Sequence, residues 1–222
     1  HIMGGEITWE CQPDGRYVFQ FSVYRDCSGA AVNVTGPLVI FNYPNVGQST
    51  TLTSSNGAGA FSNYNAPQNV ISNRDISPNC SGVGSFSCAN RDPQSVFEQI
   101  RKTDPIRLNG TPPAQGWIIT SDDFARNSND NIQGRPGITL RAKMYSTIQS
   151  RADSCLDNSP KFTERATSLL CPAISFKYNH NATDDELDSL VYEWARPLNA
   201  VNTGQSYNEG VNPSFLGYQS NY

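Results

Sequence analysis

The 222-residue sequence has little charge and no long hydrophobic run. Only 16% of its residues are charged, against about 25% in ordinary soluble domains. Asn, Ser, Thr, Gly and Pro take up the difference, and they favour turns and exposed strands over helices. The longest apolar runs, "PLVIF" and "WII", are far shorter than the ~20 residues that span a bilayer. The sequence therefore predicts no transmembrane segment.

Two further absences argue against whole classes of function. The chain carries 16 basic and 20 acidic residues without a basic run, and we expect no nucleic-acid partner because such binding requires one. His180 is the only internal histidine, and the sequence has no G-x-S-x-G elbow and no phosphate loop. One histidine cannot build the usual zinc site, so we expect no enzyme and no catalytic residues. A glycosidase that uses only carboxylates is the enzyme class left open.

Six cysteines are present, and no CxxC pair occurs among them: Cys11, Cys27, Cys80, Cys88, Cys155 and Cys171. Zinc sites usually need such close pairs, so the set predicts up to three disulfides in an oxidising compartment. Sequence alone leaves their connectivity open. Cys80 and Cys88 flank the short flexible loop "SGVGSFS", and they are the one pair that we predict.

Short β-rich runs separated by turn signals predict an all-β fold of disulfide-stabilised, Ig-like β-sandwich domains. At the N-terminus, "EITWEC" and "YVFQFSVYRDC" flank the turn "QPDGR", which is typical of a hairpin. In the second run Tyr17, Phe19, Phe21 and Val23 share one face, the expected core face. Alternation leaves helix and strand open for residues 93–103, and the neighbouring pattern favours a strand. Further strands are expected within residues 36–44, 49–55, 69–77, 116–124 and 137–148.

We expect two units. Residues 1–157 would form an N-terminal β-sandwich domain, and residues 158–222 would begin a second Ig- or cadherin-like domain. Within the second, residues 173–198 predict two strands around an acidic turn. We expect such a partial sandwich to leave an edge strand that a partner strand can complete. The three tryptophans lie in expected strands, which predicts a core or sheet-face position for Trp9, Trp117 and Trp194.

The acidic turn is the best candidate site in the sequence. Asp184, Glu186 and Asp188 alternate, so their carboxylates could converge on one point, and calcium takes six to eight such oxygen ligands. A solvated turn without an ion explains the same residues equally well, so both interpretations stay open. We expect His180, four residues before the turn, to be structural.

A series of spaced motifs carries a family resemblance. The series is "HIMGGEITWEC", "YRDCSG" at 24–29, "ISP-C" at 76–80, "RN" at 126–127, "NSPKF" at 158–162, "CPAISFKYNHNATD" from residue 171, and "DSLVY" at 188–192. Together these motifs resemble the N-terminal region of large secreted gliding-motility-associated, type IX-secreted surface proteins of Bacteroidetes. The resemblance covers most of residues 4–200. It also suggests that His1-Ile2-Met3 is natural sequence just after signal cleavage, with a cloning remnant as the alternative.

The resemblance implies a secreted protein at an extracellular or outer-membrane cell surface, built from β-sandwich repeats. The expected function is therefore a non-enzymatic N-terminal module of an adhesin or filament protein, used in gliding or attachment. Its expected partners are a surface polysaccharide, a protein ligand, or further domains or subunits of the same filament. The alternative is an extracellular glycan-binding module. Calcium is the only cofactor that we expect.

Two departures from the family pattern matter. The family's acidic turn reads D-P-D-G-D-S-L-x-Y, whereas Glu186 and Leu187 stand here for an aspartate and the glycine. Leucine adopts a positive φ with difficulty, so we expect a reshaped loop and weaker calcium binding. Phe124 and Ala125 replace the family's paired cysteines before "RN", so its disulfide map is not carried over.

Overall fold

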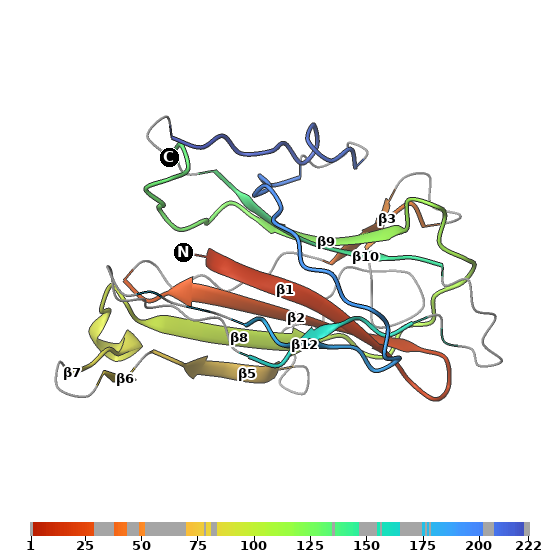
Figure 1. Cartoon of the computed structure of the whole chain (residues 1–222), viewed down its shortest axis with the longest axis horizontal. Coiled ribbons are helices and arrows are strands. Elements are labelled where there is room, and N and C mark those ends of the chain that lie inside the picture. The colour runs from red at the N-terminus through yellow and green to blue at the C-terminus, as the bar shows by residue number, and fades with distance from the viewer. Residues whose placement is uncertain are drawn as a thin grey trace.

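The structure, a computed structural model, describes residues 2–28, 38–43, 49–51, 70–77, 79–80, 84–134, 136–146, 155, 157–164, 175, 177, 179–201 and 207–219. Two four-stranded sheets lie one above the other in it, as Figure 1 shows. The first has the strand order β1-β2-β8-β5 and the second has the order β10-β9-β3-β4. Every strand pairing within them is antiparallel.

The strands of the first sheet are β1 (Ile2–Cys11), β2 (Tyr17–Asp26), β8 (Val96–Lys102) and β5 (Val70–Asp75). Those of the second are β10 (Ile138–Met144), β9 (Trp117–Asp123), β3 (Val39–Phe41) and β4 (Ser49–Thr51). Two small ribbons pair β6 (Asn79–Cys80) with β7 (Gly84–Ser85), and β11 (Lys161–Phe162) with β12 (Ala182–Thr183). The described residues include no α-helix, so the predicted all-β fold is confirmed. None of them forms a helix that could cross a membrane.

The N-terminal hairpin shows how local sequence sets the core. Its turn closes with hydrogen bonds from the Gln12 N–H to the Arg16 carbonyl (2.7 Å) and from the Gly15 N–H to the Gln12 carbonyl (2.8 Å). Gly15 has φ 76°, which glycine adopts without strain. The register pairs Trp9 with Phe19, so both strands turn their apolar faces to the same side. The predicted core face of the second strand is confirmed: its four members are buried, namely Tyr17, Phe19, Phe21 and Val23.

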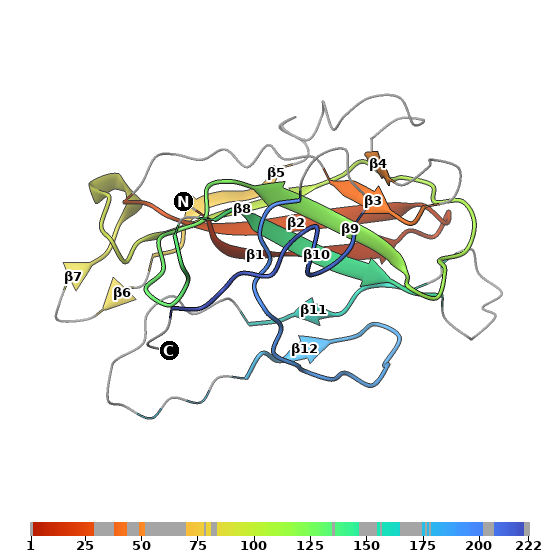
Figure 2. The ribbon, with the colours of Figure 1, turned by 90° about the horizontal axis from the view of Figure 1, so that it is seen from above.

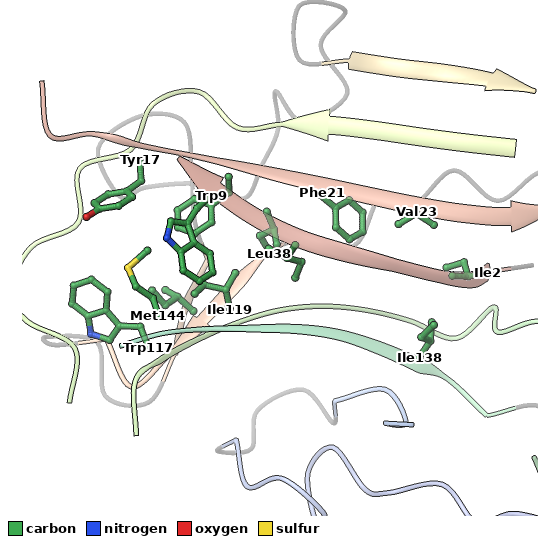
Figure 3. Close-up of a cluster of buried hydrophobic side chains, with 13 residues drawn as sticks. Ile2, Trp9, Tyr17, Phe21, Val23, Leu38, Trp117, Ile119, Ile138 and Met144 are labelled. Atoms are coloured by element: carbon green, nitrogen blue, oxygen red, sulfur yellow. The ribbon is translucent and has the colours of Figure 1, made fainter. Parts of the chain in front are cut away.

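One apolar core fills the space between the two sheets. Figure 3 shows Trp9, Tyr17, Trp117 and Met144 at one end of it and Ile2 and Ile138 at the other. Trp117, Met144 and Ile119 have no exposed surface, so the predicted core positions of Trp9 and Trp117 are confirmed. The remaining buried members are Ile7, Phe19, Phe21, Val23, Leu38 and Ile40.

Later segments of the chain cover the outer edges of β1 and β10. The Trp9 N–H donates to Ser159 Oγ (2.8 Å), and the Ser159 N–H donates to the Trp9 carbonyl (3.1 Å). Asn158 Oδ1 accepts from the Cys11 N–H (2.6 Å). At the start of β10, Asn199 Oδ1 accepts from the Gly137 N–H (2.8 Å), and on β10 the Thr139 N–H donates to the Leu198 carbonyl (3.4 Å). These bonds satisfy main-chain groups that an uncovered edge strand would present to another chain.

The β11–β12 ribbon begins directly after the segment that covers β1. Figure 1 shows β12 in front of β2 and β8, and Figure 2 shows the ribbon offset outward from β1. The ribbon therefore lies over the outer face of the first sheet, the face turned away from the core. The segments on either side of the expected domain boundary at 157/158 are joined to the first sheet by hydrogen bonds, and the division into two domains stays a prediction.

The second strand expected around the acidic turn is wrong. Residues 188–197 form no β-ladder, although "DSLVYEW" alternates as a strand would. Trp194 is 100% exposed, so the core or sheet-face position predicted for it is wrong as well. Alternation identifies a strand only where a neighbouring strand supplies the hydrogen bonds, and this segment has no ladder partner. Within residues 93–103, where the sequence left helix and strand open, the structure has a strand, β8.

The predicted pairing of Cys80 with Cys88 is wrong. Cys88 is bonded to Cys27, with the two Cα atoms 4.9 Å apart, and Cys11 is bonded to Cys155 across 144 residues (Cα–Cα 5.7 Å). Cys80 lies on β6, where it pairs with Gly84 of β7. Cys171 lies outside the described residues.

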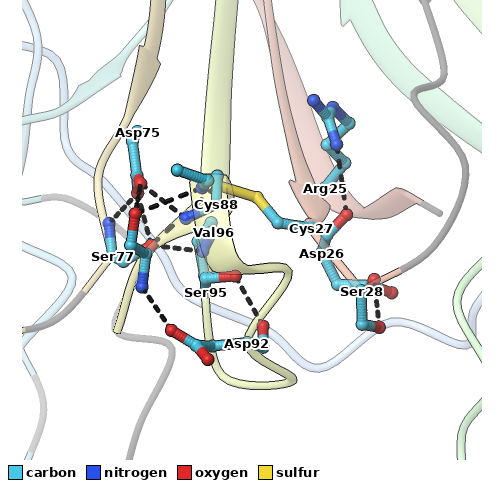
Figure 4. The surroundings of a disulfide bond; sticks show 12 residues. Arg25, Asp26, Cys27, Ser28, Asp75, Ser77, Cys88, Asp92, Ser95 and Val96 are labelled. Carbon is cyan, nitrogen blue, oxygen red and sulfur yellow. Dashed lines mark hydrogen bonds between the residues drawn. A yellow bond between two sulfur atoms is a disulfide. The ribbon is translucent and has the colours of Figure 1, made fainter. Parts of the chain in front are cut away.

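Sheet pairing explains why Cys88 meets Cys27. The β2–β8 ladder sets Asp26 opposite Val96, and the Cys27 N–H donates to the Ser95 carbonyl (3.2 Å). Figure 4 shows Asp75 beside this disulfide, where its carboxylate accepts from the Cys88 N–H (2.7 Å). Burial raises the pKa of Asp75, but its hydrogen bonds outweigh that effect and hold the pKa below its ordinary value. The short 3₁₀ turn at Cys88–Asn90 is thereby fixed next to the end of β2.

We predict that Cys27→Ser, Cys88→Ser and the double variant lose the same stability, because each change removes one and the same bond. The expected loss is about 2–4 kcal/mol, measured by urea unfolding. Peptide mapping under non-reducing conditions should recover Cys27 linked to Cys88. A Cys27→Ser protein with wild-type stability, or a recovered Cys80–Cys88 peptide, would contradict this pairing.

Candidate functional site

The acidic turn is closed by its own first carboxylate. Asp184 Oδ1 accepts hydrogen bonds from the N–H groups of Glu186 and Asp188, both at 3.0 Å. The Leu187 N–H donates to the Asp184 carbonyl at 3.2 Å. Asp184 therefore serves as the cap that shapes the turn, which is a common use of aspartate in loops.

The next two carboxylates tie the turn to neighbouring segments. Asn158 Nδ2 donates to Glu186 Oε1 (2.8 Å), and the same Asn158 side chain accepts from the Cys11 N–H on β1. Lys161 Nζ lies 3.1 Å from Asp185 Oδ2 and 3.7 Å from Glu10 Oε2. Burial lowers the pKa of Lys161, but its hydrogen bond with Asp185 and the charges of both carboxylates raise it overall. The turn is thus fastened to the ribbon and to the edge of the first sheet.

The carboxylates of the three predicted calcium ligands therefore have different roles in this structure. Asp184 caps the turn, Glu186 accepts a hydrogen bond from Asn158, and Asp188 is exposed to solvent. Within the described part of the chain, no three His, Cys, Asp or Glu side chains are grouped closely enough to hold a metal ion. Calcium binding at this turn stays a prediction.

Leu187 adopts a left-handed backbone conformation that favours glycine. Its φ is 62°, and the residue is 89% exposed. The reshaped loop expected at this position stays a prediction; Leu187 itself adopts a positive φ, in a turn that the hydrogen bonds of Asp184 close. A non-glycine residue in the left-handed region costs roughly 1–2 kcal/mol, so the turn retains strain that no burial of Leu187 offsets.

His180 joins the ribbon to the segment that follows the turn. Its ring centroid lies 5.4 Å from that of Phe162 and 5.8 Å from that of Tyr192, with the Tyr192 ring stacked. The Tyr192 hydroxyl accepts from the Ala182 N–H (2.9 Å). The only internal histidine is therefore part of an aromatic cluster with Phe162 of β11 and Tyr192.

A groove runs between the ribbon and the outer face of the first sheet, and we call it the outer-face groove. It consists of two adjoining cavities of about 460 Å³ and 440 Å³. Both are lined by Glu6 on β1, Gln20 on β2, Ile71 on β5 and Phe162 on β11. Because these four residues border both cavities, the groove is continuous across the sheet. Glu6 and Phe162 also border a third cavity, of about 480 Å³, between β1 and β10.

Glu6 is the most unusual ionisable group of this groove. Burial raises the pKa of its carboxyl above the ordinary value, and no ion pair or hydrogen bond with another described residue offsets that effect. Other charged groups that line the groove form ion pairs. Lys161 pairs with Glu10, and Arg74 Nε lies 3.2 Å from Glu98 Oε2. A half-buried carboxyl with a shifted pKa inside a cleft is a typical mark of a binding site.

This groove was not predicted from the sequence, although the sequence holds one signal for it. In "EITWEC", Ile7 and Trp9 take the core face, which places Glu6, Thr8 and Glu10 on the opposite face. What alternation cannot supply is the position of Phe162, which follows β1 in the chain by about 150 residues.

A second surface is formed by residues 187–194, and we call it the exposed apolar segment. Trp194 is fully exposed and Val191 is 79% exposed. Leu187 and Tyr192 are exposed as well. Large apolar side chains gathered on a surface mark sites of contact with other molecules.

Comparison with known proteins identifies no relative. No family model, no curated protein and no solved structure matches this chain. Its function is therefore inferred from its own residues.

We predict that Leu187→Gly raises the free energy of unfolding by up to about 1 kcal/mol, because glycine adopts a positive φ without the steric cost. Leu187→Ala is the matched control, since alanine also removes the exposed side chain but retains Cβ. Urea unfolding of the three proteins provides the comparison. Equal stability of the Gly and Ala variants would show that the turn is not strained.

For the predicted ion, calcium is expected to raise the melting temperature of the chain, and Asp188→Ala is expected to abolish the rise. Thermal unfolding with added calcium and with EDTA provides the measurement, and Asp130→Ala serves as the control for loss of an exposed carboxylate. An unchanged melting temperature in the wild-type protein removes the calcium hypothesis.

Proposed function

We propose that this chain is a non-enzymatic binding module of a secreted surface adhesin or filament protein, acting in attachment or gliding through contacts with a protein ligand or with further domains of the same filament. The observation that carries the proposal is the exposed apolar segment on a disulfide-bonded, all-β body. Disulfides are typical of proteins in oxidising compartments, which supports an extracellular or cell-surface location. The finer proposal of an Ig-like domain type rests on the sandwich of two antiparallel sheets.

The chemistry of the exposed apolar segment suits a protein partner. Tryptophan and tyrosine contribute strongly to protein interfaces because they bury much area at a low cost in side-chain entropy. Trp194 and Tyr192 supply such groups, and residues 188–197 leave the main chain outside any ladder. A partner strand could pair with such a main chain while its side chains pack against the aromatic rings.

The outer-face groove favours the alternative function, capture of an extracellular glycan. It is a concave site with an aromatic side chain, Phe162, and many side chains that form hydrogen bonds. The two functions are compatible, because the exposed apolar segment and the groove use different residues.

To test the proposal, beads coated with the chain are scored for attachment to cells of the organism that exports it. Trp194→Ser is expected to lower attachment at least tenfold without lowering the melting temperature, because the side chain has no internal contact to lose. Phe124→Ser is the matched control: Phe124 is 76% exposed and lies outside the segment. Wild-type attachment by the Trp194→Ser protein would contradict the proposed role of the segment.

A further inference from the structure

The outer-face groove has the form of a site for an extended ligand. Its two cavities adjoin each other through Glu6, Gln20, Ile71 and Phe162. The first extends toward Glu10 and Lys102, and the second extends across β8 to β5. A ligand that filled both would lie across several strands, so a chain of linked units fits the groove better than a compact molecule.

The floor of the groove is the face of a sheet and not its edge. The strands β1, β2, β8 and β5 use their main-chain groups in ladders with one another. A peptide that binds by strand addition pairs with an edge strand, whereas a ligand in this groove lies over the face of the sheet, with the outermost strand β5 only at one end of it. Recognition in this groove therefore depends on side chains.

The polar side chains of the floor match the hydroxyl groups of a sugar. Gln12 and Gln20 carry amide groups that both donate and accept hydrogen bonds. Phe162, half exposed on the ribbon, supplies an apolar ring above them. A pyranose combines an apolar C–H face with a rim of hydroxyls, so it can contact the ring and the floor at once.

The charge of the groove argues against an anionic glycan. Its lining holds four carboxylates, from Glu6, Glu10, Glu98 and Glu164, and three cations, from Arg74, Lys102 and Lys161. The excess is one negative charge, and Glu6 is the carboxylate at the junction of the two cavities. Uronate or sulfate groups placed there would meet repulsion in a partly desolvated site.

We propose that the outer-face groove binds a neutral polysaccharide chain, with Phe162 stacking on the face of one sugar and the Glu6 carboxylate accepting hydrogen bonds from its hydroxyls. The proposal rests on the proposed function as a binding module and assigns a site and ligand class to its glycan-binding alternative. It accounts for the placement of Glu6: a half-buried carboxylate without a partner among the described residues is costly, and a ligand hydroxyl supplies the missing donor.

The test is affinity electrophoresis of the full chain in gels that contain soluble neutral polysaccharides with different backbones, followed by titration calorimetry with oligosaccharides of any that retards it. Phe162→Ala and Glu6→Gln are each expected to weaken binding at least tenfold. Phe124→Ala and Asp130→Asn remove an exposed ring and an exposed carboxylate outside the groove, and both are expected to bind as wild type. Binding should persist in EDTA.

Stability separates a lost contact from a lost fold. Because burial raises the pKa of Glu6, its ionisation costs stability as the pH rises through that pKa. Glu6→Gln should therefore be at least as stable as wild type at neutral pH while it binds less.

Three results would overturn the groove assignment: no retardation by any neutral polysaccharide, tighter binding of a uronate or sulfated glycan, or wild-type binding by both groove variants. If attachment of coated beads still depends on Trp194 in any of these cases, the proposed function stands and only the groove assignment falls. If attachment is also independent of Trp194, both fail.

Discussion

The attachment of Cys155 and residues 157–159 to the edge of β1 is the constraint on which the rest of this structure depends. A covalent bond joins Cys155 to Cys11, and Ser159 exchanges two hydrogen bonds with the main chain of Trp9. An uncovered edge strand is prone to pair with other chains. Here that edge is covered by a segment nearly 150 residues later in the chain, so one set of contacts both closes the sheet and fixes where the later segment begins.

The position of the ribbon follows from that attachment. Pro160 and β11 continue directly from Ser159, and Lys161 is held between Glu10 of β1 and Asp185 of the acidic turn. Asn158 connects β1 to Glu186 of the same turn. The cluster of acidic residues that drew attention in the sequence thus serves to fasten the ribbon above the sheet. The ribbon held in this way forms one wall of the outer-face groove, with Phe162 beside the sheet, and the candidate binding site is this groove.

Local patterns predicted the β1–β2 hairpin well because the inner face of each of its two strands is encoded by its own alternation. "YVFQFSVY" specified its buried face, and the turn "QPDGR" specified its partner. Features that depend on distant pairing could not be predicted in this way. Cys88 bonds to Cys27 because β8 lies beside β2, and not because of its own spacing from Cys80. The alternation of "DSLVYEW" is that of a strand, yet no ladder partner is present and Trp194 stays in solvent. The groove needs both a polar sheet face, which alternation implies, and a ribbon placed by a distant disulfide.

The exposed apolar segment and the outer-face groove depend on the same arrangement. The ribbon that borders the groove precedes the acidic turn in the chain, and the exposed apolar segment begins within the turn and continues beyond it. The most direct test of this account is native-state hydrogen exchange of the Trp9 and Cys11 amides. If Cys155 and residues 157–159 seal the edge of β1, these amides exchange as slowly as those of Phe19 and Phe21 in the adjacent strand. If they exchange as fast as amides of an open edge, the segment does not hold β1, and the position of the ribbon and its groove has no support.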